Sequence, residues 1–586
     1  MLPAWDLSDL YICSNDPLLL SDKQTLSEKT MLFSKAYKGQ LTSAQNVLNA
    51  VTEFEAIQNL STKIGVYARL LSFIHLDKPE VQSFFQEIVE FLTQIEQPLT
   101  FFTLELNAID ETVLQQYFLD EPKLSFYKPW FRRLRFFKPY QLDEKLEQLL
   151  NDKSITSTQM WMRLYDESIS KLKFHYEGTE FGIAGISDLL SHKSEDVRKK
   201  AAHSIQQTLK NCGDIFTTIT NVLAKDLEIS DTWRGFKHLG DSRHLSNDVE
   251  ADVVNNLIQT VKQNYGNLSH RFYKLKAKLL NVEKINYWDR NAPLPFDDDT
   301  TYSFDEAKDI VLNAYGDFDD RIKSLVQKFF DNPWIDAKES PSKYPGAFNM
   351  PTFKGHHPYI LLNFKGKLRD VTTLAHELGH GIHSLLGDHL GIFMSNAPLT
   401  LCETASVFGE MLTFQYLLKQ CHDKKTKIKA LESKLSDMIN TVVRQIAFFD
   451  FEYKIHQKRR EGKELSRKEM NEIWLNIQKE ALGPSVIVDE NVEEFWMTIP
   501  HFIHSPFYVY AYAFGDCLVN SLYQKYQTEP DGFQDKYLDL LKAGGSLHHK
   551  ELLEPFNLNA SDSAFWQNGL SVVINLLNQL EDELTL

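Results

Sequence analysis

The segment His376-Glu377-Leu378-Gly379-His380 has two histidines and a glutamate at a spacing that could bind a metal ion and activate water. On an α-helix, His376 and His380 lie one turn apart on the same face, so both imidazoles can bind one tetrahedral cation. A bound zinc ion lowers the pKa of water to about 7, and a carboxylate outside the ligand set can accept the proton. Glu377 lies close enough to have that role. The pattern therefore predicts a hydrolytic zinc site.

A third ligand has to come from elsewhere in the chain, because two histidines do not complete a zinc site. Glu403 is the best candidate, since it lies 27 residues after His376 (403 − 376) in a predicted helix, 401–410, that follows a turn at 396–398. The turn would let Glu403 approach the cation and leave a fourth position open. We predict that His376, His380 and Glu403 bind one zinc ion per chain. The alternative is a helix whose buried histidines are satisfied by hydrogen bonds.

Neighbouring residues are expected to have supporting roles. His383 lies two turns along the helix from the first ligand, so it cannot converge on the same ion. Cys402 points about 100° away from Glu403, which favours a role in core packing. Ser406 and Glu410, three and seven positions after Glu403, could orient the histidine ligands. Glu410 could equally be a solvated helix carboxylate.

The helix that carries the motif has recognisable ends. Asp370 can act as its N-cap, the run Val371–Leu386 contains no proline, and Gly387 could end the helix in a left-handed conformation. Gly379 and Gly381 each lower the helix propensity by about 1 kcal/mol relative to alanine. Glycines in such positions are typical of close packing or of backbone approach near a ligand.

Most of the chain has the apolar periodicity of α-helices, for example at 249–261. Ser303-Phe304-Asp305-Glu306 has the spacing of a capping box and predicts the start of another helix. Tyr359–Phe364 is the clearest strand candidate, because aromatic and branched residues cluster there between a proline and a Lys-Gly turn. Such a strand could pair with an extended peptide, with Tyr359 touching the substrate. The alternative is an ordinary core strand.

The motif and several distant segments resemble a known family. His376–His383 and Glu403–Glu410 are similar to the thimet-oligopeptidase (M3) family of zinc peptidases, in particular to its oligoendopeptidase F branch. Further segments of resemblance are Trp5–Tyr11, Trp233–Phe236, Arg243–Ser246, His357–Phe364 and Ser561–Trp566. The resemblance thus extends over nearly the whole chain.

This resemblance implies a mostly α fold, a multi-helix, bowl-like zincin metallopeptidase with a small β-sheet beside the active-site helix. It implies an N-terminal helical lobe at 1–190 and a catalytic zinc peptidase domain at 191–586. A deep channel in such a fold would admit short unfolded peptides and exclude folded proteins. The expected activity is hydrolysis of internal peptide bonds by a zinc-activated water, with Glu377 as general base.

A second group of candidate residues lies further along the chain. The resemblance implies that a histidine and tyrosines there stabilise the oxyanion of peptide hydrolysis, a role that can contribute roughly 3 to 4 kcal/mol. His501 and Tyr508 are the best matches, and Tyr510 and Tyr512 are candidate substrate contacts. The choice among the three tyrosines stays open. Pro506 is expected at the first position of a helix, and without the resemblance the segment would be an aromatic core face.

Composition and charge exclude several classes of protein. With 586 residues, of which 43% are hydrophobic, the chain can bury a large core and is not disordered. A net charge of −17 argues against nucleic acid or an anionic membrane as a partner. The first residues lack the pattern of a signal peptide, and no apolar run is long enough to span a bilayer. Five scattered cysteines suit a reducing compartment, so we expect a cytoplasmic protein.

Two other functions are compatible with the motif. A zinc carboxypeptidase or dipeptidyl carboxypeptidase would need a cationic pocket for a free C-terminus, which the sequence does not reveal. A non-catalytic, zinc-stabilised peptide-binding protein would have no need of Glu377, so this glutamate favours an enzyme. The resemblance implies short peptides as substrates, and the sequence does not give the cleavage preference, the physiological substrate or the oligomeric state.

Overall fold

In the computed structural model, the described residues, 2–296 and 301–585, are mostly helical and form three small β-sheets. This confirms the mostly α fold class. The chain folds as two compact units, each assembled from three separate stretches of sequence. Unit 1 comprises Met1–Pro139, Thr300–Gln420 and Thr528–Asn557, and unit 2 comprises Tyr140–Asp299, Cys421–Gln527 and Leu558–Leu586. The expected domains 1–190 and 191–586 are continuous stretches of sequence and stay a prediction.

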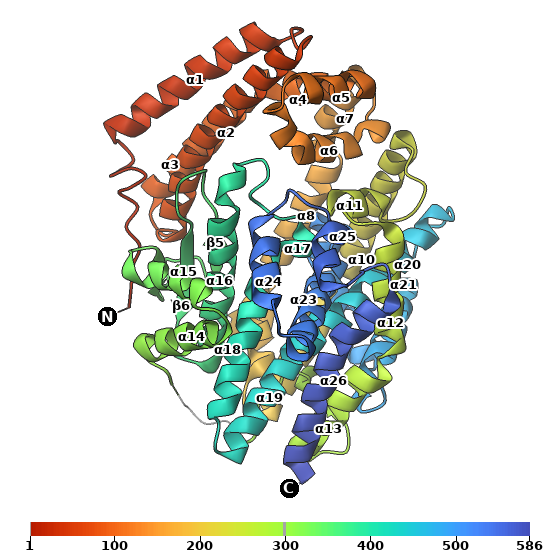
Figure 1. Ribbon diagram of the computed structural model, residues 1–586. Coiled ribbons are helices and arrows are strands. Elements are labelled where there is room, and N and C mark those ends of the chain that lie inside the picture. The colour runs from red at the N-terminus through yellow and green to blue at the C-terminus, as the bar shows by residue number, and fades with distance from the viewer. Residues whose placement is uncertain (1, 297–300, 586) are drawn as a thin grey trace. The chain divides into compact units, whose positions relative to one another are not determined.

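Unit 1 begins with α-helices that pack side by side, shown in red and orange in Figure 1. Their bounds are α1 Pro17–Tyr37, α2 Ala44–Phe73, α3 Pro79–Glu96, α4 Thr100–Ala108, α5 Glu111–Asp120 and α6 Lys128–Phe136. Asp16 caps α1 by accepting the N–H of Leu18 at 2.8 Å, and Pro17 occupies the first helical position. The apolar core between these helices includes Phe33 and Phe102, whose rings meet edge to face.

The middle of unit 1 surrounds one buried helix, α16, with other helices (Figure 1). The bounds are α14 Phe304–Phe318, α15 Asp320–Asp331, α16 Leu368–Gly387, α17 Leu399–Cys402, α18 Ser406–Gln420, α24 Phe533–Lys542 and α25 His549–Leu553. Leu374, Leu378 and Ile382 give α16 an apolar face that is fully buried against its neighbours. The capping box predicted at Ser303 is confirmed and opens α14.

The ends of α16 differ from the prediction. Asp370 is not the N-cap, because the helix already begins at Leu368; its carboxylate instead accepts the N–H groups of Lys365 and Lys367 at 2.8 and 2.9 Å. Gly387 has a φ of −82° and is not left-handed. A Cβ atom at Gly387 would lie 2.8 Å from the carbonyl oxygen of Ser395, so close packing explains this glycine better than a helix cap.

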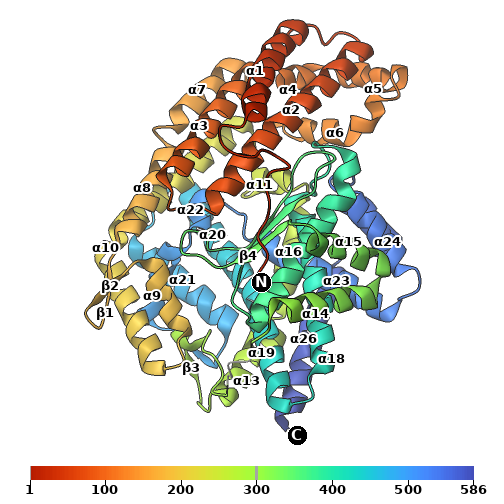
Figure 2. The same cartoon turned by 90° about the vertical axis from the view of Figure 1, so that its left-hand side faces the viewer.

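A three-stranded sheet packs beside α16 and contains the predicted strand (Figure 2). The strands are β4 Ile335–Lys338, β5 Phe348–Met350 and β6 Tyr359–Phe364, in the order β4-β6-β5. β6 has the predicted bounds, runs parallel to β4 and pairs antiparallel with β5. The predicted pairing of β6 with a substrate is wrong, because both of its edges are occupied. Tyr359 is fully buried and donates to Asp9, so it is not a substrate contact.

Unit 2 is built around the long helix α10, which packs on α8, α20 and α21. Its helices are α7 Glu144–Ser154, α8 Thr158–Lys171, α9 Ile183–Asp188, α10 Glu195–Arg234, α11 Asp241–Ser246, α12 Ala251–Gln263, α13 Arg271–Leu279, α19 Lys424–Ile439, α20 Gln445–Arg460, α21 Arg467–Leu482, α22 His501–His504, α23 Tyr510–Thr528 and α26 Ser563–Thr585. The helix predicted at 249–261 is confirmed as α12, within two residues at each end.

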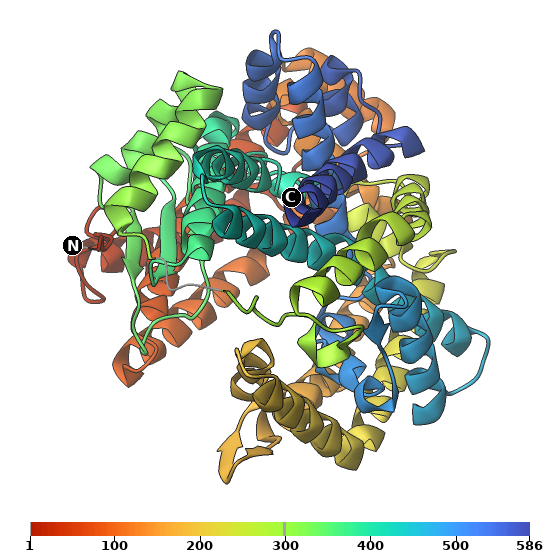
Figure 3. The same ribbon diagram turned by 90° about the horizontal axis from the view of Figure 1, so that it is seen from below.

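The strands of unit 2 form two further small sheets. β1 Phe174–Tyr176 and β2 Thr179–Phe181 make the antiparallel hairpin drawn as gold arrows in Figure 3. β3 Ile285–Asn286 pairs in parallel with β7 Val486–Ile487. Within residues 2–296 and 301–585, no helix combines the length and the apolar character needed to cross a lipid bilayer.

A buried lysine holds the sheet of unit 1 together and generates the first prediction. The ammonium of Lys343 donates to the Asp336 carboxylate and to the Leu362 carbonyl, each at 2.5 Å, and so links β4 with β6. Lys343→Met should lower the free energy of unfolding by about 3 to 5 kcal/mol, because it leaves a buried carboxylate without its cation. Chemical denaturation measures this loss.

The exposed Lys338 provides the control, since Lys338→Met removes the same charge at a solvated position. Adding Asp336→Asn to the Lys343→Met variant should restore part of the lost stability, because no unpaired charge then remains buried. Equal losses for Lys343→Met and Lys338→Met would contradict the proposed importance of the buried pair.

Candidate functional site

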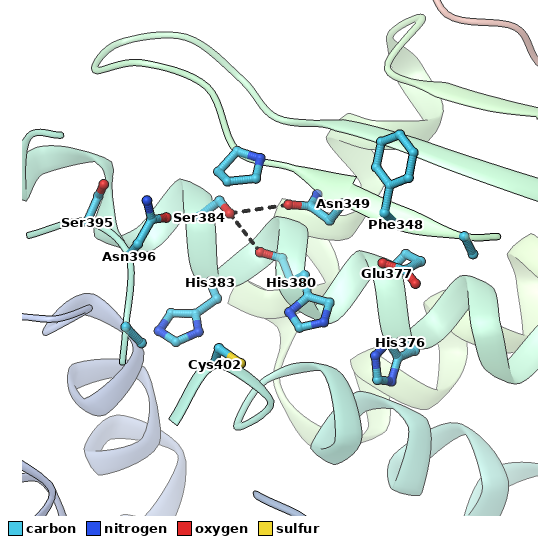
Figure 4. A pocket seen from close by; sticks show the side chains of 13 residues that line it. Phe348, Asn349, His376, Glu377, His380, His383, Ser384, Ser395, Asn396 and Cys402 are labelled. Carbon is cyan, nitrogen blue, oxygen red and sulfur yellow. Dashed lines mark hydrogen bonds between the residues drawn. The ribbon is translucent and has the colours of Figure 1, made fainter. Parts of the chain in front are cut away.

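Three side chains of unit 1 come together beside α16 with the spacing of metal ligands. Nε2 of His376 lies 3.3 Å, and Nε2 of His380 3.4 Å, from Oε2 of Glu403. Ligand atoms about 2.1 Å from a tetrahedral ion lie about 3.4 Å from one another. Figure 4 shows the two imidazoles projecting from the same side of the helix, as predicted. The structure thus brings together the three residues that the sequence singled out, in an arrangement that can hold a metal ion.

Glu403 reaches this position from a turn and not from a helix. α17 ends at Cys402 and α18 begins at Ser406, so the continuous helix predicted at 401–410 is wrong. The turn packs directly on α16 at Gly379, where a Cβ atom would lie 2.4 Å from the carbonyl oxygen of Ala405. The turn between α17 and α18 can therefore approach α16 this closely only because residue 379 is a glycine.

Ser406 and Glu410 hold different members of the cluster. The Ser406 hydroxyl donates to Oε2 of Glu403 at 2.7 Å, so it positions the carboxylate. The prediction that Ser406 orients a histidine is therefore wrong. Oε2 of Glu410 lies 3.4 Å from Nδ1 of His376. Of the two roles left open for Glu410, the contact with a histidine is the one observed. A carboxylate at Nδ1 orients the ring so that Nε2 faces the cluster.

The charges around the cluster favour a cation. Burial lowers the pKa of His376, but the carboxylates of Glu410, Glu377 and Glu403 raise it more, to about 9. Burial raises the pKa of Glu403, yet His380 and His376 lower it to about 2, so this carboxylate is ionised. The site thus stabilises positive charge near the imidazoles, which a proton or a metal ion can provide.

Glu377 lies next to the cluster without belonging to it. Its side chain is buried, 6% exposed, and burial raises its pKa although His376 and His380 lower it. It faces a cavity of about 350 Å³ between α16 and β5, together with Phe348 and Asn349 (Figure 4). A carboxylate whose pKa is raised can accept a proton near neutral pH.

Other residues of the cavity were not all foreseen. His383 is buried there, and burial lowers its pKa to about 4, so it is neutral and outside the metal cluster. Phe348, Asn349 and Asn396 also line the cavity and were missed by the sequence analysis. β5 is only three residues long, and no motif or periodicity marks it. The apolar strand β6, with which β5 pairs, was the sequence feature that could have pointed to β5.

The second group of candidate residues forms an aromatic cluster in unit 2. Nε2 of His501 lies 3.2 Å from the hydroxyl of Tyr512, and the rings of Tyr508 and Tyr512 meet edge to face with centroids 5.2 Å apart. All three side chains are partly exposed. Burial lowers the pKa of His501, which keeps it neutral at pH 7. The roles predicted for His501 and Tyr508 at an oxyanion, and for Tyr512 with substrate, stay predictions.

Tyr510 does not belong to the exposed cluster, so its predicted contact with substrate is wrong. It is fully buried, and its hydroxyl accepts a hydrogen bond from Asn247 at 2.8 Å and lies 3.1 Å from Nδ1 of His244. The expected helix start at Pro506 is also wrong, since α23 begins at Tyr510. The preceding residues form an irregular turn that the sequence pattern did not indicate.

The turn before α23 is strained and has a buried carboxyl beneath it. Phe507 has a φ of 57°, an unusual value for a bulky side chain. Arg243 donates to the carbonyl oxygen of Pro506 at 3.0 Å. Burial raises the pKa of Glu452 to about 8, although the Phe507 N–H and Arg243 lower it. The turn that presents Tyr508 is thus held by an arginine and lies next to a buried carboxyl that is protonated at neutral pH.

Comparisons with known proteins identify relatives along nearly the whole chain. The sequence profile described as Peptidase family M3 matches residues 189–572, and that described as Oligopeptidase F matches residues 105–174. Oligopeptidase PepF of Bacillus subtilis is 26% identical over 99% of this chain and 87% of its own length. An oligoendopeptidase F homolog of Borreliella burgdorferi is 28% identical over 97% of this chain and 96% of its own length.

Solved structures have the same fold. Oligoendopeptidase-F from Enterococcus faecium superposes with a TM-score of 0.73 at 21% identity, covering 96% of this chain and 98% of its own. A candidate peptidase from Chlamydophila abortus superposes with a TM-score of 0.87 at 24% identity, covering 99% and 98%. At these identities the likeness shows the fold alone.

The contact at Gly379 predicts a specific effect on metal binding. Gly379→Ala should push the turn that carries Glu403 away from α16 and weaken the binding of a divalent ion roughly 10- to 100-fold. Competition with a chromophoric chelator measures the affinity. Gly381→Ala is the matched control on the same helix, since its Cβ atom would meet the ring of Phe329 and not the turn. Equal metal affinities of the two variants would contradict the proposed role of Gly379.

The raised pKa of Glu452 predicts how stability changes with pH. The native state binds a proton that the unfolded state releases above its ordinary pKa of 4.5, so this contribution to stability is full below about pH 4.5 and is lost as pH rises through about 8. In Glu452→Gln that loss, on the order of 4 kcal/mol, should disappear. Urea unfolding at pH 5 and pH 8 compares the two proteins, and identical changes would refute the assignment.

Proposed function

Because the chain belongs to peptidase family M3, we propose that it is a zinc-dependent oligoendopeptidase that hydrolyses internal bonds of short peptides. It is a metalloendopeptidase, and its substrates are peptides. One observation supports the proposal of zinc-dependent hydrolysis. Two imidazoles and one carboxylate have the spacing of three tetrahedral ligands, and a buried carboxylate that is not a ligand lies beside them. Zinc catalysis in hydrolases needs this division of roles.

The donor set suits zinc as the resident metal. His376, His380 and Glu403 offer two nitrogens and one oxygen, as in catalytic zinc sites that keep one position open. Zinc held there supplies a Lewis acid that polarises the peptide carbonyl and acidifies water. The surrounding carboxylates favour positive charge, and Glu410 and Ser406 each orient one ligand. We propose one zinc ion per chain at this cluster.

Glu377 carries the proton transfers in the proposed mechanism. Its carboxylate accepts a proton from the attacking water and then donates that proton to the leaving amine, so that it returns to its initial state. Burial raises its pKa and brings its proton affinity closer to what transfer at neutral pH requires. His501 and Tyr508 are proposed to donate hydrogen bonds to the oxyanion, with Tyr512 contacting the peptide. Their partial exposure and the neutral imidazole support these roles.

The edge strand β5 is the proposed docking place for the substrate backbone. Among the described strands, β5 pairs only with β6, so no described strand occupies the other edge, and we propose that an extended peptide pairs there. Phe348 and Asn349 of this strand line the cavity next to Glu377. Backbone pairing recognises the peptide main chain and accepts many sequences, as an enzyme for varied short peptides requires.

The cavity supports endopeptidase activity over carboxypeptidase activity. No lysine or arginine is found among the described residues that line it, whereas a carboxypeptidase needs a cation for the free C-terminus. We also propose a cytoplasmic location, which the five free cysteines support.

Substitution of the general base tests the mechanism. Glu377→Gln should keep the bound metal and the fold but lose a factor of roughly 100 to 10,000 in turnover, because an amide cannot accept the proton. Cleavage of an internally quenched peptide gives the rate, and metal analysis gives the zinc content. Turnover within about tenfold of the parent enzyme, a change of about 1.4 kcal/mol in the barrier, is incompatible with this role.

Glu403→Ala provides the matched comparison, since it removes a carboxylate of the same cluster that we assign as a ligand. This variant should lose zinc and activity together. Full zinc occupancy in Glu403→Ala would show that the third ligand lies elsewhere.

Blocked peptides test the position of cleavage. A peptide of about ten residues, up to roughly 35 Å when extended, should be cut internally with both termini blocked. The same sequence inside a stable folded domain should survive, because it would have to unfold and lose its packing to pair with β5. Mass spectrometry of parallel digests, with Glu377→Gln as the inactive control, identifies the products. Cleavage confined to peptides with a free C-terminus would establish carboxypeptidase activity instead.

A further inference from the structure

A second cluster of metal-binding side chains lies in unit 1, away from the motif of α16. It consists of Asp9, in a turn of the N-terminal segment, and of His356 and His357, just before β6. Nε2 of His357 lies 2.7 Å, and Nε2 of His356 3.5 Å, from Oδ2 of Asp9. Residues more than 340 positions apart in the sequence thus meet through their potential ligand atoms.

The backbone determines which nitrogen of each ring carries a proton. Nδ1 of His356 lies 3.0 Å from the carbonyl oxygen of His357, and Nδ1 of His357 lies 3.1 Å from that of Pro358. A carbonyl oxygen only accepts, so both Nδ1 atoms are the donors. In the neutral rings, each Nε2 therefore has a lone pair that faces the same carboxylate oxygen. A positive charge, either a proton or a metal ion, has to lie between them.

A divalent metal ion satisfies this arrangement better than a single proton. One proton can join only one imidazole to Asp9, whereas a metal ion accepts lone pairs from all three groups. The separation of 3.5 Å already matches the distance of about 3.4 Å between tetrahedral ligands, and the separation of 2.7 Å has to open by about 0.7 Å. Histidine bound to metal through Nε2, with Nδ1–H on a backbone carbonyl, is the usual arrangement in metal sites.

The surroundings hold the ligands in place. The ring of His357 stacks on Trp334 at 4.1 Å and on His356 at 4.4 Å. The hydroxyl of Tyr359 donates to the other carboxylate oxygen of Asp9 at 2.5 Å. Both imidazoles are largely buried, 13 and 14% exposed, whereas the Asp9 side chain is 42% exposed. A metal ion can therefore enter from solvent, and water can complete its coordination.

We propose that Asp9, His356 and His357 form a second metal site, which takes a divalent ion of the zinc type and fastens the N-terminal segment to the sheet of unit 1. That segment already follows the sheet: the N–H of Asp6 donates to the Pro333 carbonyl, and the N–H of Ala337 donates to the Pro3 carbonyl, each at 3.0 Å. A bound metal ion adds coordination bonds between the turn of this segment and the two histidines. We assign it a structural role, because two of its ligands immediately precede β6 and the third belongs to the N-terminal segment.

Metal counting on the full-length protein tests this proposal. After equilibration with a small excess of Zn²⁺ and removal of free metal, the parent should hold two zinc ions per chain, His380→Ala one, and Asp9→Asn one. The double variant Asp9→Asn/His380→Ala should hold none. Asp6→Asn is the matched control, because it makes the same change in the same segment outside the cluster. It should hold two.

A second measurement does not depend on a stable Asp9 variant. Co²⁺ added to His380→Ala should bind one equivalent with visible absorption bands, and the midpoint of thermal unfolding should rise by a few degrees. Introducing His356→Gln should abolish both effects. One zinc ion in the parent, or an unchanged count and unchanged Co²⁺ binding in the Asp9 and His356 variants, would overturn the proposal. These outcomes are independent of peptidase activity.

Discussion

The close approach of α16 to the turn that carries Glu403 is the contact on which the candidate site depends. Gly379 lets the backbone at Ala405 lie where a Cβ atom would otherwise be. A second close contact joins three helices. Tyr315 of α14 donates to the carbonyl oxygen of Ala375 on α16 at 2.9 Å, and its ring occupies the space beside Gly409 of α18. Three helices are thereby held close enough for ligand atoms from different elements to come within 3.4 Å of one another.

This packing places several carboxylates close together, which costs electrostatic free energy. Glu377, Glu403 and Glu410 all lie close enough to His376 to raise its pKa. Gathering carboxylates in a half-buried place is unfavourable unless positive charge accompanies them. In the proposed mechanism, a divalent ion at His376, His380 and Glu403 compensates two of these charges and leaves Glu377 free to exchange a proton. Under that proposal, the ion that neutralises the cluster and the burial that raises the pKa of Glu377 both favour a catalytic role for this carboxylate.

The three strands of the sheet in unit 1 have different structural roles. β6 is the buried centre and packs against the core of the N-terminal helices. β4 is tied to β6 by Lys343 and to the N-terminal segment by a backbone hydrogen bond at Ala337. β5 is the edge strand on the other side of β6, its outer edge is not covered by any described strand, and it lies beside Glu377. Fastening residues at the chain start to this sheet, through Asp9 and its histidines, would therefore make the support of the site more rigid.

The sequence alone determined the residue types that do chemistry, the helix that carries two of them, the bounds of β6 and the mostly α fold, because these depend on local spacing and periodicity. It also singled out Glu403, but not the turn that presents it. Tertiary structure decided that β5 and not β6 has the open edge, that Tyr510 is buried whereas Tyr512 is partly exposed, and that Asp9 meets two histidines far along the chain. Each of these depends on contacts between residues distant in sequence, and no local pattern contains them.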